Sequence, residues 1–384
     1  MPKWRIEFLA SVPPEETSSG LGRVVWELAA SLAALGHRVR VLYPADTAAP
    51  HPPYRSVEAV PVPVPASARR PFGRDIAFGR AATALLDREA DLIVGNDEKA
   101  GAIGPIRGRR AGRPVFAMFV HDVALHTFDT LRPLEARRGV RQRVGNWLDR
   151  RTLRRLEETA LNRARLILVG SALNEQLLRE HYPDASTRVR RLPLGVPPPL
   201  DVGSKAEARQ SLRIPLDVPV VVTVGRTPER QGLPTALDAF RRVRVFFPGA
   251  RFIVVGSSPP TEPGVLSLGV VDEATKARAL RAADVFLFPA RYEGFGLAPR
   301  EAMGYGLAAV VSSHVPLDGI DREEAIRVVA TDDPGDYASE LAELLADPAL
   351  RRDIGEAASE CAESFTFDRM AERFEKAFAP LLPS

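Results

Sequence analysis

Two glutamates and the glycines between them are the residues of this 384-residue chain whose types and spacing best suit ligand binding. Glu293 and Glu301 lie eight positions apart in YEGFGLAPREAMGYG, residues 292–306. A carboxylate accepts two hydrogen bonds and suits a vicinal diol, whereas backbone N–H groups of a glycine-rich loop or a helix N-terminus attract phosphate oxygens. Together they predict a site for a molecule with a sugar at each end of a diphosphate. Taken singly, Glu301 is also explained as a helix-start charge and Glu293 as a solvated surface charge.

The flanking residues predict where this stretch lies in the fold. DVFLFPA, residues 284–290, is typical of a buried strand, and RYEGFGLA is the loop that leaves its carboxyl end. Pro299 falls where a helix begins, a position that tolerates the missing N–H of proline. We therefore expect Glu293 on the loop and Glu301 in the first helical turn, at the strand ends where open α/β sheets bind ligands.

The rest of the chain alternates short β-branched runs with longer amphipathic runs, which is typical of parallel sheets with crossover helices. The pattern occurs twice, on either side of the proline-rich segment 191–203, which we expect to be a stiff linker. We predict an α/β chain with two doubly wound domains facing a central cleft. The predicted strands are residues 4–11, 38–44, 91–96, 114–122, 165–171, 218–226, 251–257, 284–290 and 307–313; the predicted helices include 22–36, 233–247, 273–283 and two at the C-terminus.

Length and composition limit the class of protein. A chain of this length suits two domains, and 45% hydrophobic with 26% charged residues is typical of a globular protein. No run of eighteen apolar residues and no signal-peptide pattern occurs, so we expect a cytoplasmic protein. The single cysteine, Cys361, and six scattered histidines provide no disulfide and no metal-ligand spacing, so we expect no structural metal.

Positive charge is concentrated in the first half. Residues 1–192 hold 31 Lys and Arg against 21 Asp and Glu, with many of the arginines in segments 107–113 and 135–158. The second segment also has apolar residues at roughly helical spacing, namely Val140, Val144, Trp147 and Leu148. A basic amphipathic helix can lie on an anionic membrane or face an acidic partner, or its apolar stripe can simply pack on its own domain. We expect no nucleic-acid binding, because the basic stretches lack interleaved aromatic residues.

The segment from Glu293 to Met303 resembles the E-x7-E signature of the family-4 retaining glycosyltransferases, which have the GT-B fold of two Rossmann-like domains. The resemblance covers nearly the whole chain. It includes the glycine-rich opening, the last strand of the first domain, the crossover, the phosphate-contacting segment and the final helix, at residues 18–44, 166–178, 190–196, 222–240 and 365–378 respectively.

This resemblance implies a division of roles. Residues 1–195 would form the acceptor-side domain, residues 196–365 the nucleotide-sugar donor-binding domain, and residues 366–384 a helix that returns to the first domain. Glu301 would bind the ribose hydroxyls of the nucleotide. Glu293 would act in catalysis and, with the following backbone, face the donor sugar and phosphates; that donor-binding backbone is Gly294, Phe295, Gly296 and Leu297.

Two glycines near the N-terminus form a second candidate phosphate contact. Gly20 and Gly22 follow a predicted strand and open a helix, so their amides could approach the diphosphate from the other domain. A tight turn without a ligand is the alternative. A dinucleotide-binding fingerprint would need a third glycine where Val25 stands, which disfavours an oxidoreductase.

His121 ends the predicted strand 114–122 and resembles the family histidine that lies near the transferred sugar. We therefore count it as a candidate catalytic residue facing the cleft. The alternative is a buried histidine whose hydrogen bonds are satisfied within the domain.

The phosphate segment GRTPERQG departs from the family. Arg226 matches the arginine that contacts the diphosphate, but Gln231 replaces the usual lysine. One cation is missing, and each group that stabilises the departing charge is worth roughly 2–4 kcal/mol in a dry site. We expect Arg226 to act in catalysis and Gln231 to line the donor site. Either Arg230 substitutes for the lysine, or the enzyme is slow.

The resemblance implies a retaining, hexosyltransferase-type enzyme of glycan biosynthesis. It would transfer a sugar from a nucleotide-diphosphate sugar to a hydroxyl of a glycan, lipid or other acceptor, without metal or cofactor. The basic first domain could hold it peripherally at an anionic membrane. The alternatives are a non-catalytic nucleotide-sugar-binding subunit, or a related sugar phosphorylase or epimerase.

Overall fold

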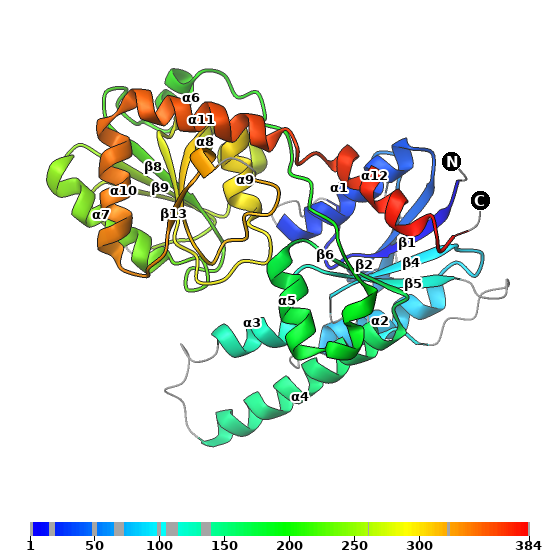
Figure 1. Cartoon of the computed structure of the whole chain (residues 1–384). Helices are drawn as coiled ribbons and strands as arrows, with labels where there is room; N and C mark the ends of the chain where they lie inside the picture. Colours follow the sequence, from blue (N-terminus) through cyan, green and yellow to red (C-terminus); the bar gives the residue numbers. More distant parts are fainter. Residues whose placement is uncertain are drawn as a thin grey trace. The chain divides into compact units, whose positions relative to one another are not determined.

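The chain divides into two units (Figure 1). Unit 1 comprises Met1–Gly195 with Phe367–Ser384, and unit 2 comprises Val196–Thr366. This computed structural model describes residues 3–14, 20–47, 52–64, 73–97, 101–104, 114–131, 140–259, 261–320 and 323–382. In both units the described strands pair in parallel, so the prediction of two parallel, Rossmann-like α/β halves is confirmed.

Unit 1 contains a seven-stranded sheet in the order β3-β2-β1-β4-β5-β6-β7. The chain starts at the interior strand β1, winds to one edge, and then returns to build the other half, as a doubly wound sheet does. The strands are β1 Arg5–Leu9, β2 Arg38–Ala45, β3 Glu58–Pro63, β4 Leu92–Asn96, β5 Val115–Val120, β6 Leu166–Val169 and β7 Val189–Arg191. The helices are α1 Gly20–Ala34, α2 Gly73–Leu85, α3 Ala124–Leu131, α4 Val140–Arg163, α5 Ala172–His181 and α12 Phe367–Phe378.

The last helix, α12, packs on α1 within unit 1 (Figure 1). His37 and Glu375 lie 2.8 Å apart between ring Nε2 and carboxylate Oε1, and both are buried. Ser31 donates a second hydrogen bond to Asp368, at 2.8 Å. The buried face of α12, with Met370 and the aromatic residues that follow it, supplies the apolar contact that fixes the end of the chain on unit 1.

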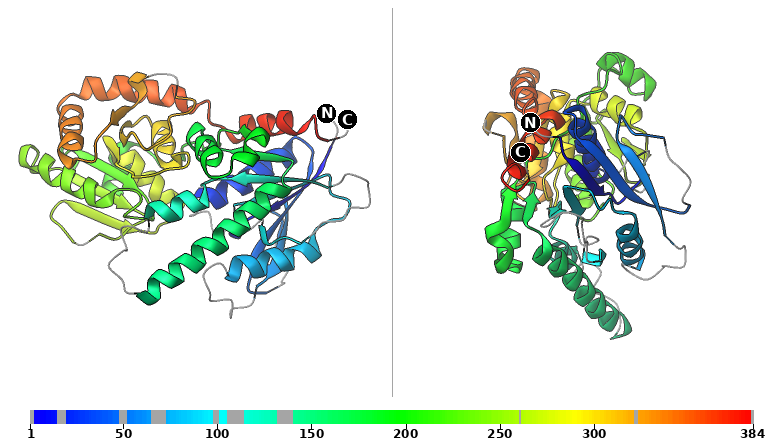
Figure 2. Two further views of the ribbon diagram at one scale, coloured as in Figure 1. Left: turned by 60° about the horizontal axis from the view of Figure 1, so that its bottom comes forward. Right: turned by 90° about the vertical axis from the view of Figure 1, so that its right-hand side faces the viewer.

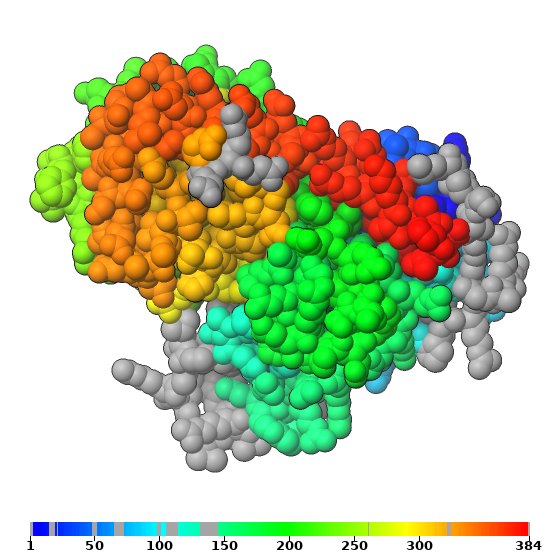
Figure 3. Space-filling model, viewed as in Figure 1, coloured from blue at the N-terminus to red at the C-terminus, as the bar shows by residue number. Residues whose placement is uncertain are grey.

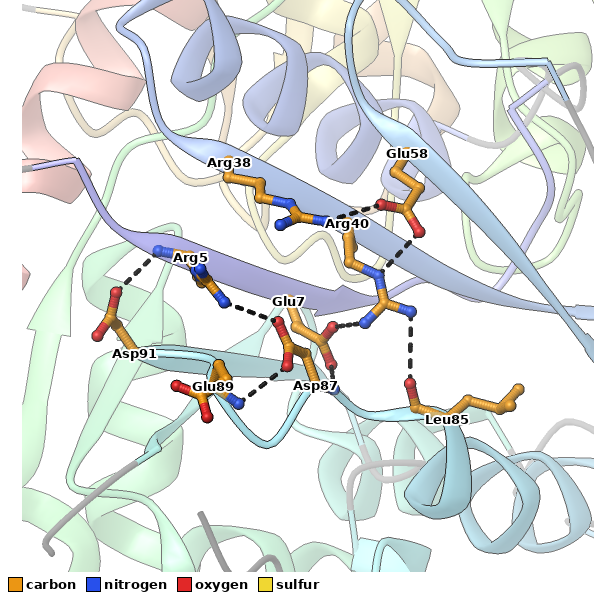
Figure 4. Close-up of polar contacts among 9 residues, drawn as sticks. All are labelled: Arg5, Glu7, Arg38, Arg40, Glu58, Leu85, Asp87, Glu89 and Asp91. Atoms are coloured by element: carbon orange, nitrogen blue, oxygen red, sulfur yellow. Dashed lines mark hydrogen bonds and ion pairs between the residues drawn. The ribbon is translucent and has the colours of Figure 1, made fainter. Parts of the chain in front are cut away.

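A buried carboxylate on β1 is held by an ion pair inside the sheet of unit 1 (Figure 4). Glu7 is 1% exposed, contacts the Arg40 guanidinium of β2, and accepts a hydrogen bond from the Asp87 amide at 3.0 Å. Burial raises the pKa of Glu7, and Arg40 offsets part of that rise. Because Asp87 and Asp91 precede β4, this network lies toward the amino ends of the strands and is structural rather than part of a ligand site.

Unit 2 contains a six-stranded sheet in the order β10-β9-β8-β11-β12-β13. The strands are β8 Val220–Val224, β9 Arg251–Val255, β10 Val265–Gly269, β11 Val285–Phe288, β12 Ala308–Ser312 and β13 Arg327–Val329. The helices are α6 Lys205–Ser211, α7 Leu233–Phe246, α8 Glu273–Ala282, α9 Leu297–Gly304, α10 Pro334–Ala346 and α11 Pro348–Ala362. Figure 3 shows α10 and α11, in orange, forming one continuous surface of this unit.

Alternate residues of the unit 2 strands belong to two separate apolar cores. Val222 and Phe286 join the core under α8, α9 and α11, whereas Val221 and Leu287 join the core under α7 and α10. Successive side chains of a strand point to opposite faces, so a sheet covered on both sides needs strands that are apolar throughout. The largely apolar strands VVVTV and VFLF therefore allow helices to pack on both faces of the sheet.

Several expectations needed correction. The sequence predicted two C-terminal helices and the structure has three, α10, α11 and α12. Four strands were not predicted, namely β3, β7, β10 and β13. They form the sheet edges, and each is short, partly exposed or interrupted by proline, as in EAVPVP of β3. The expected linker, 191–203, overlaps the end of β7 and is otherwise without helix or strand.

Candidate functional site

The loop between β11 and α9 carries the first glutamate of the E-x7-E pair. Gly296 ends the loop with φ +78° and is the N-cap of α9. A Cβ atom at this position would lie 2.8 Å from the Val315 side chain, so both the backbone conformation and the space require glycine. The helix starts at Leu297, so Glu301 lies in the second turn of α9 and not in the first turn, as the sequence had suggested.

Glu301 is tied to the neighbouring helix α8 through Lys276. The Lys276 Nζ atom lies 2.7 Å from Glu301 Oε2 and 3.0 Å from Glu273 Oε2. Burial favours a lower pKa for Lys276, but the two carboxylates outweigh it, so the pKa is raised. The lysine is therefore charged at neutral pH, and it fixes one oxygen of Glu301. The other oxygen makes no hydrogen bond to the described residues and keeps its capacity to accept one.

Glu293 lies against the phosphate segment on the other side of its loop. Arg230 Nη2 is 3.4 Å from Glu293 Oε2, and the Arg230 guanidinium covers the Tyr292 ring at 5.1 Å. Gln231 Nε2 donates to Glu293 Oε1 at 3.5 Å. The structure thus brings together Arg230, Gln231 and Glu293, which were predicted separately from segments about sixty residues apart.

The replacement of the usual lysine by Gln231 has a local structural counterpart. Its Oε1 accepts a hydrogen bond from the Thr227 amide at 2.9 Å, a bond that a lysine cannot accept. Gly225 leaves room for the Gln231 side-chain amide, because a Cβ atom at position 225 would lie 2.2 Å from Gln231 Oε1. Arg226, between these residues, is exposed at the carboxyl end of β8. The glutamine therefore closes the turn that presents Arg226.

Arg300 is a fully buried residue beneath the same loop that the sequence analysis did not single out. Its guanidinium donates to the carbonyls of Phe295, Gly296 and Asp318, and it stacks on the Phe295 ring at 4.0 Å. Burial lowers its pKa to about 9, which leaves it charged at neutral pH. A positive charge that holds two loop carbonyls orients the peptide groups of the glycine-rich loop. Its spacing of three from Met303 puts both on one face of the helix, but only the structure shows that this face is buried.

His121 is held at three points inside unit 1. It is 3% exposed, its Nε2 lies 3.2 Å from Asn96 Oδ1, its amide donates to Asp97 Oδ1 at 3.0 Å, and its carbonyl accepts from Asn174 at 2.7 Å. Asn96 donates its amide nitrogen to the Leu9 carbonyl, so its oxygen faces the histidine and His121 Nε2 carries the proton. These contacts fix the ring of a residue at the carboxyl end of β5.

The N-terminal glycines open α1. Gly20 is the first residue of the helix and is exposed, and Gly22 is buried in its first turn. Ser18 and Ser19, which directly precede Gly20, lie outside the described residues. The basic segment 107–113 lies outside them too. Gly20, Gly22 and His121 thus belong to unit 1, whereas the other candidate residues belong to unit 2.

Two family models match the chain and cover most of it. Residues 18–199 match the model described as Glycosyltransferase Family 4, and residues 218–347 match the model described as Glycosyl transferases group 1. The chain belongs to glycosyltransferase family 4. The second match includes the whole cluster of Arg226, Arg230, Glu293 and Glu301 in this family-4 glycosyltransferase.

Named relatives agree with this assignment. The glycosyltransferase is similar to phosphatidyl-myo-inositol mannosyltransferase of Mycolicibacterium smegmatis, with 29% identity over 90% of this chain and 86% of the relative. It is also similar to D-inositol 3-phosphate glycosyltransferase of Acidothermus cellulolyticus, with 27% identity over 94% of this chain and 85% of the relative. Among solved structures, sucrose-phosphate synthase from Thermosynechococcus elongatus has a TM-score of 0.78 at 20% identity, over 99% of each chain. The GT-B fold implied by the sequence is therefore confirmed.

The described part of the glycosyltransferase has neither a cluster of metal ligands nor a membrane-spanning helix. No group of three or more His, Cys, Asp or Glu side chains there is arranged to hold a metal ion. No helix there is both long enough and apolar enough to cross a membrane.

Proposed function

We propose that this family-4 glycosyltransferase transfers a hexosyl group from a nucleoside-diphosphate sugar to an acceptor hydroxyl, with retention of anomeric configuration. The observation that carries the proposal is the cluster at the carboxyl edge of the unit 2 sheet. There Glu301 keeps one carboxylate oxygen for a ribose hydroxyl, and the loop that ends at Gly296 presents its backbone to phosphate oxygens. Arg226 and Arg230 supply positive charge to the same edge.

The proposed chemistry needs no protein nucleophile. As the anomeric bond loosens toward an oxocarbenium ion, Arg226, Arg230 and the start of α9 stabilise the departing diphosphate. Following the family resemblance, the acceptor hydroxyl enters from the same face and gives its proton to that phosphate. Glu293 sets the position of Arg230 and Gln231 and faces the donor sugar. The family resemblance adds His121 as a further catalytic residue. The proposal includes no metal and no further cofactor.

For the acceptor we propose an inositol-bearing lipid, since the names of both relatives include inositol and one is a phosphatidyl-myo-inositol mannosyltransferase. Helix α4 supports this choice. Its side chains Trp147 and Leu148 are 57% and 52% exposed, so they do not pack on their own domain. Arg151 covers the Trp147 ring at 5.4 Å and, like Arg155, is exposed. Figure 2 shows the first part of α4 extending beyond the sheet of unit 1. Basic and apolar residues together suit peripheral contact with an anionic membrane.

The alternative of a non-catalytic nucleotide-sugar-binding subunit rests on the missing lysine at Gln231, and both proposals require nucleotide binding. A thermal-shift titration with UDP, GDP and ADP tests that shared requirement. One of them should stabilise the protein by about 2.7 kcal/mol at 100 times its dissociation constant. If none stabilises the wild type more than its Glu301→Ala variant, the donor site is misassigned. Turnover of the matching sugar nucleotide, with and without acceptor, then separates a transferase from a binding subunit, a phosphorylase or an epimerase.

A further inference from the structure

A cavity lies at the opposite end of the unit 2 strands from the donor loop. It has a volume of about 360 Å³, and its lining includes Asp284 and Leu307. Asp284 directly precedes β11 and Leu307 directly precedes β12, so the cavity lies at the amino ends of these strands. The loop with Glu293 leaves the carboxyl end of β11. The cavity is therefore separate from the proposed donor site, and all of its lining residues belong to unit 2.

The cavity carries an excess of positive charge. Its lining includes four basic side chains, Lys205, Arg281, Arg351 and Arg352. The acidic side chain in the lining, Asp284, already has partners. Lys205 lies 2.5 Å from its Oδ1, and the buried Arg209 lies 2.8 Å from its Oδ2. The single negative charge of Asp284 is thus shared by Lys205 and Arg209 and offsets only one of their two positive charges, which leaves the three arginines of the lining to face an anion.

Arg281 gives the clearest indication of a ligand. Its guanidinium covers the Tyr305 ring at 5.2 Å, while its Nε is buried and has no hydrogen-bond acceptor among the described residues. The stack fixes the plane of the guanidinium, and its terminal amino groups, which make no hydrogen bond to the described residues, can donate to an anionic oxygen in the cavity. Arg351 is steadied by a hydrogen bond to the Leu345 carbonyl at 2.9 Å, and Arg352 is exposed at the rim.

We propose that this cavity binds a small phosphorylated molecule, either inorganic phosphate or the phosphate group of a sugar phosphate. Arginine is suited to phosphate because its planar fork donates two parallel hydrogen bonds. The volume is at the lower end of the range for small-molecule sites, which suits a sugar monophosphate better than a nucleotide sugar. The Tyr305 hydroxyl, which accepts from the Leu200 amide at 2.9 Å, adds a polar group beside the arginines. This proposal does not depend on the proposed transfer reaction.

Isothermal titration of the full chain with inorganic phosphate and with glucose 6-phosphate tests the site, with glucose as the ligand control. The wild type should bind both phosphates saturably and glucose not at all. Arg281→Gln and Arg352→Gln should each weaken binding about tenfold or more, because a hydrogen bond between charged groups is worth about 1.5–3 kcal/mol. Arg242→Gln, which changes an exposed arginine of α7, is the matched control and should bind as the wild type does.

Arg226→Gln separates this cavity from the donor site and should leave phosphate binding in place. The proposal is overturned if the wild type shows no saturable binding, if Arg226→Gln abolishes the binding, or if both cavity variants bind as the wild type does. Circular dichroism checks that Arg281→Gln folds; if it does not, Arg352→Gln decides, because that side chain is exposed.

Discussion

Lys276 on α8 forms a 2.7 Å ion pair with Glu301 on α9. The proposed ribose-binding carboxylate is therefore not an isolated surface charge. One of its oxygens is fixed by a largely buried ammonium group whose pKa the pair raises, and the other makes no hydrogen bond to the described residues. Because the lysine stays charged, it holds the carboxylate in a single orientation before any ligand arrives, which reduces the entropy lost on binding.

Glu301→Ala should weaken donor binding about 10- to 100-fold with a smaller effect on turnover, because a ribose contact acts in the ground state and the transition state alike. Glu293→Ala should lower turnover more than affinity, because it releases Arg230 and Gln231. Steady-state kinetics of both variants check this. Glu273→Ala, which removes the other carboxylate on Lys276, is the control and should leave donor affinity near that of the wild type.

The phosphate segment gives a second prediction. Arg226→Ala should lower kcat/KM about a hundredfold or more, and Arg230→Ala should cause a measurable part of that loss. Gln231→Lys should change donor cleavage little, because Arg230, which lies against Glu293, already supplies the positive charge. Any benefit of the new charge is also offset, because lysine cannot accept the hydrogen bond from the Thr227 amide. Donor hydrolysis rates compare the three. A large gain in rate for Gln231→Lys would show instead that the site lacks one cation.

Arg300→Met should destabilise unit 2 by about 1–3 kcal/mol or more, because it leaves the Phe295 and Gly296 carbonyls of the donor loop without this donor. It should also raise KM for the donor, since the loop loses its orientation, whereas Arg300→Lys should restore part of both losses. Urea unfolding and steady-state kinetics measure the two effects. Arg209→Met is the control, because Arg209 is also buried but bonds to the Ala282 carbonyl away from the loop. Equal donor KM values for both Met variants would leave Arg300 with a purely structural role.

Most of the fold could be predicted because its central strands are apolar on both faces and its helices are long and periodic. The edge strands could not, since a strand such as β13 has only three residues and follows no burial pattern. In the site, the pair of glutamates and its loop were visible from spacing alone. Lys276 and Arg300 were not, because a charged residue in a helix is usually solvated, and only packing shows that these two are turned inward.

Membrane contact gives a fourth prediction. Wild-type protein should sediment with vesicles that contain phosphatidylinositol more than with neutral vesicles, and less so at 1 M salt, where the Debye length falls to about 3 Å. Trp147→Ser should weaken this binding about tenfold or more, because its exposed indole would enter the interface. Leu216→Ser, at an exposed apolar residue of unit 2, is the control. If anionic and neutral vesicles bind alike, α4 is a solvated helix and the lipid acceptor loses its support.

The most direct test of the account is the anomeric configuration of the product. The protein, incubated with an α-linked nucleoside-diphosphate hexose and phosphatidylinositol vesicles, should release nucleoside diphosphate and form an α-linked product, as measured by NMR of the anomeric proton. The rate should survive EDTA, since the proposed charge stabilisation comes from Arg226, Arg230 and the start of α9. A β-linked product, or complete and reversible loss of turnover with EDTA, would contradict the proposed mechanism. Nucleotide binding with no release of diphosphate for any sugar nucleotide would replace the transferase with a binding subunit.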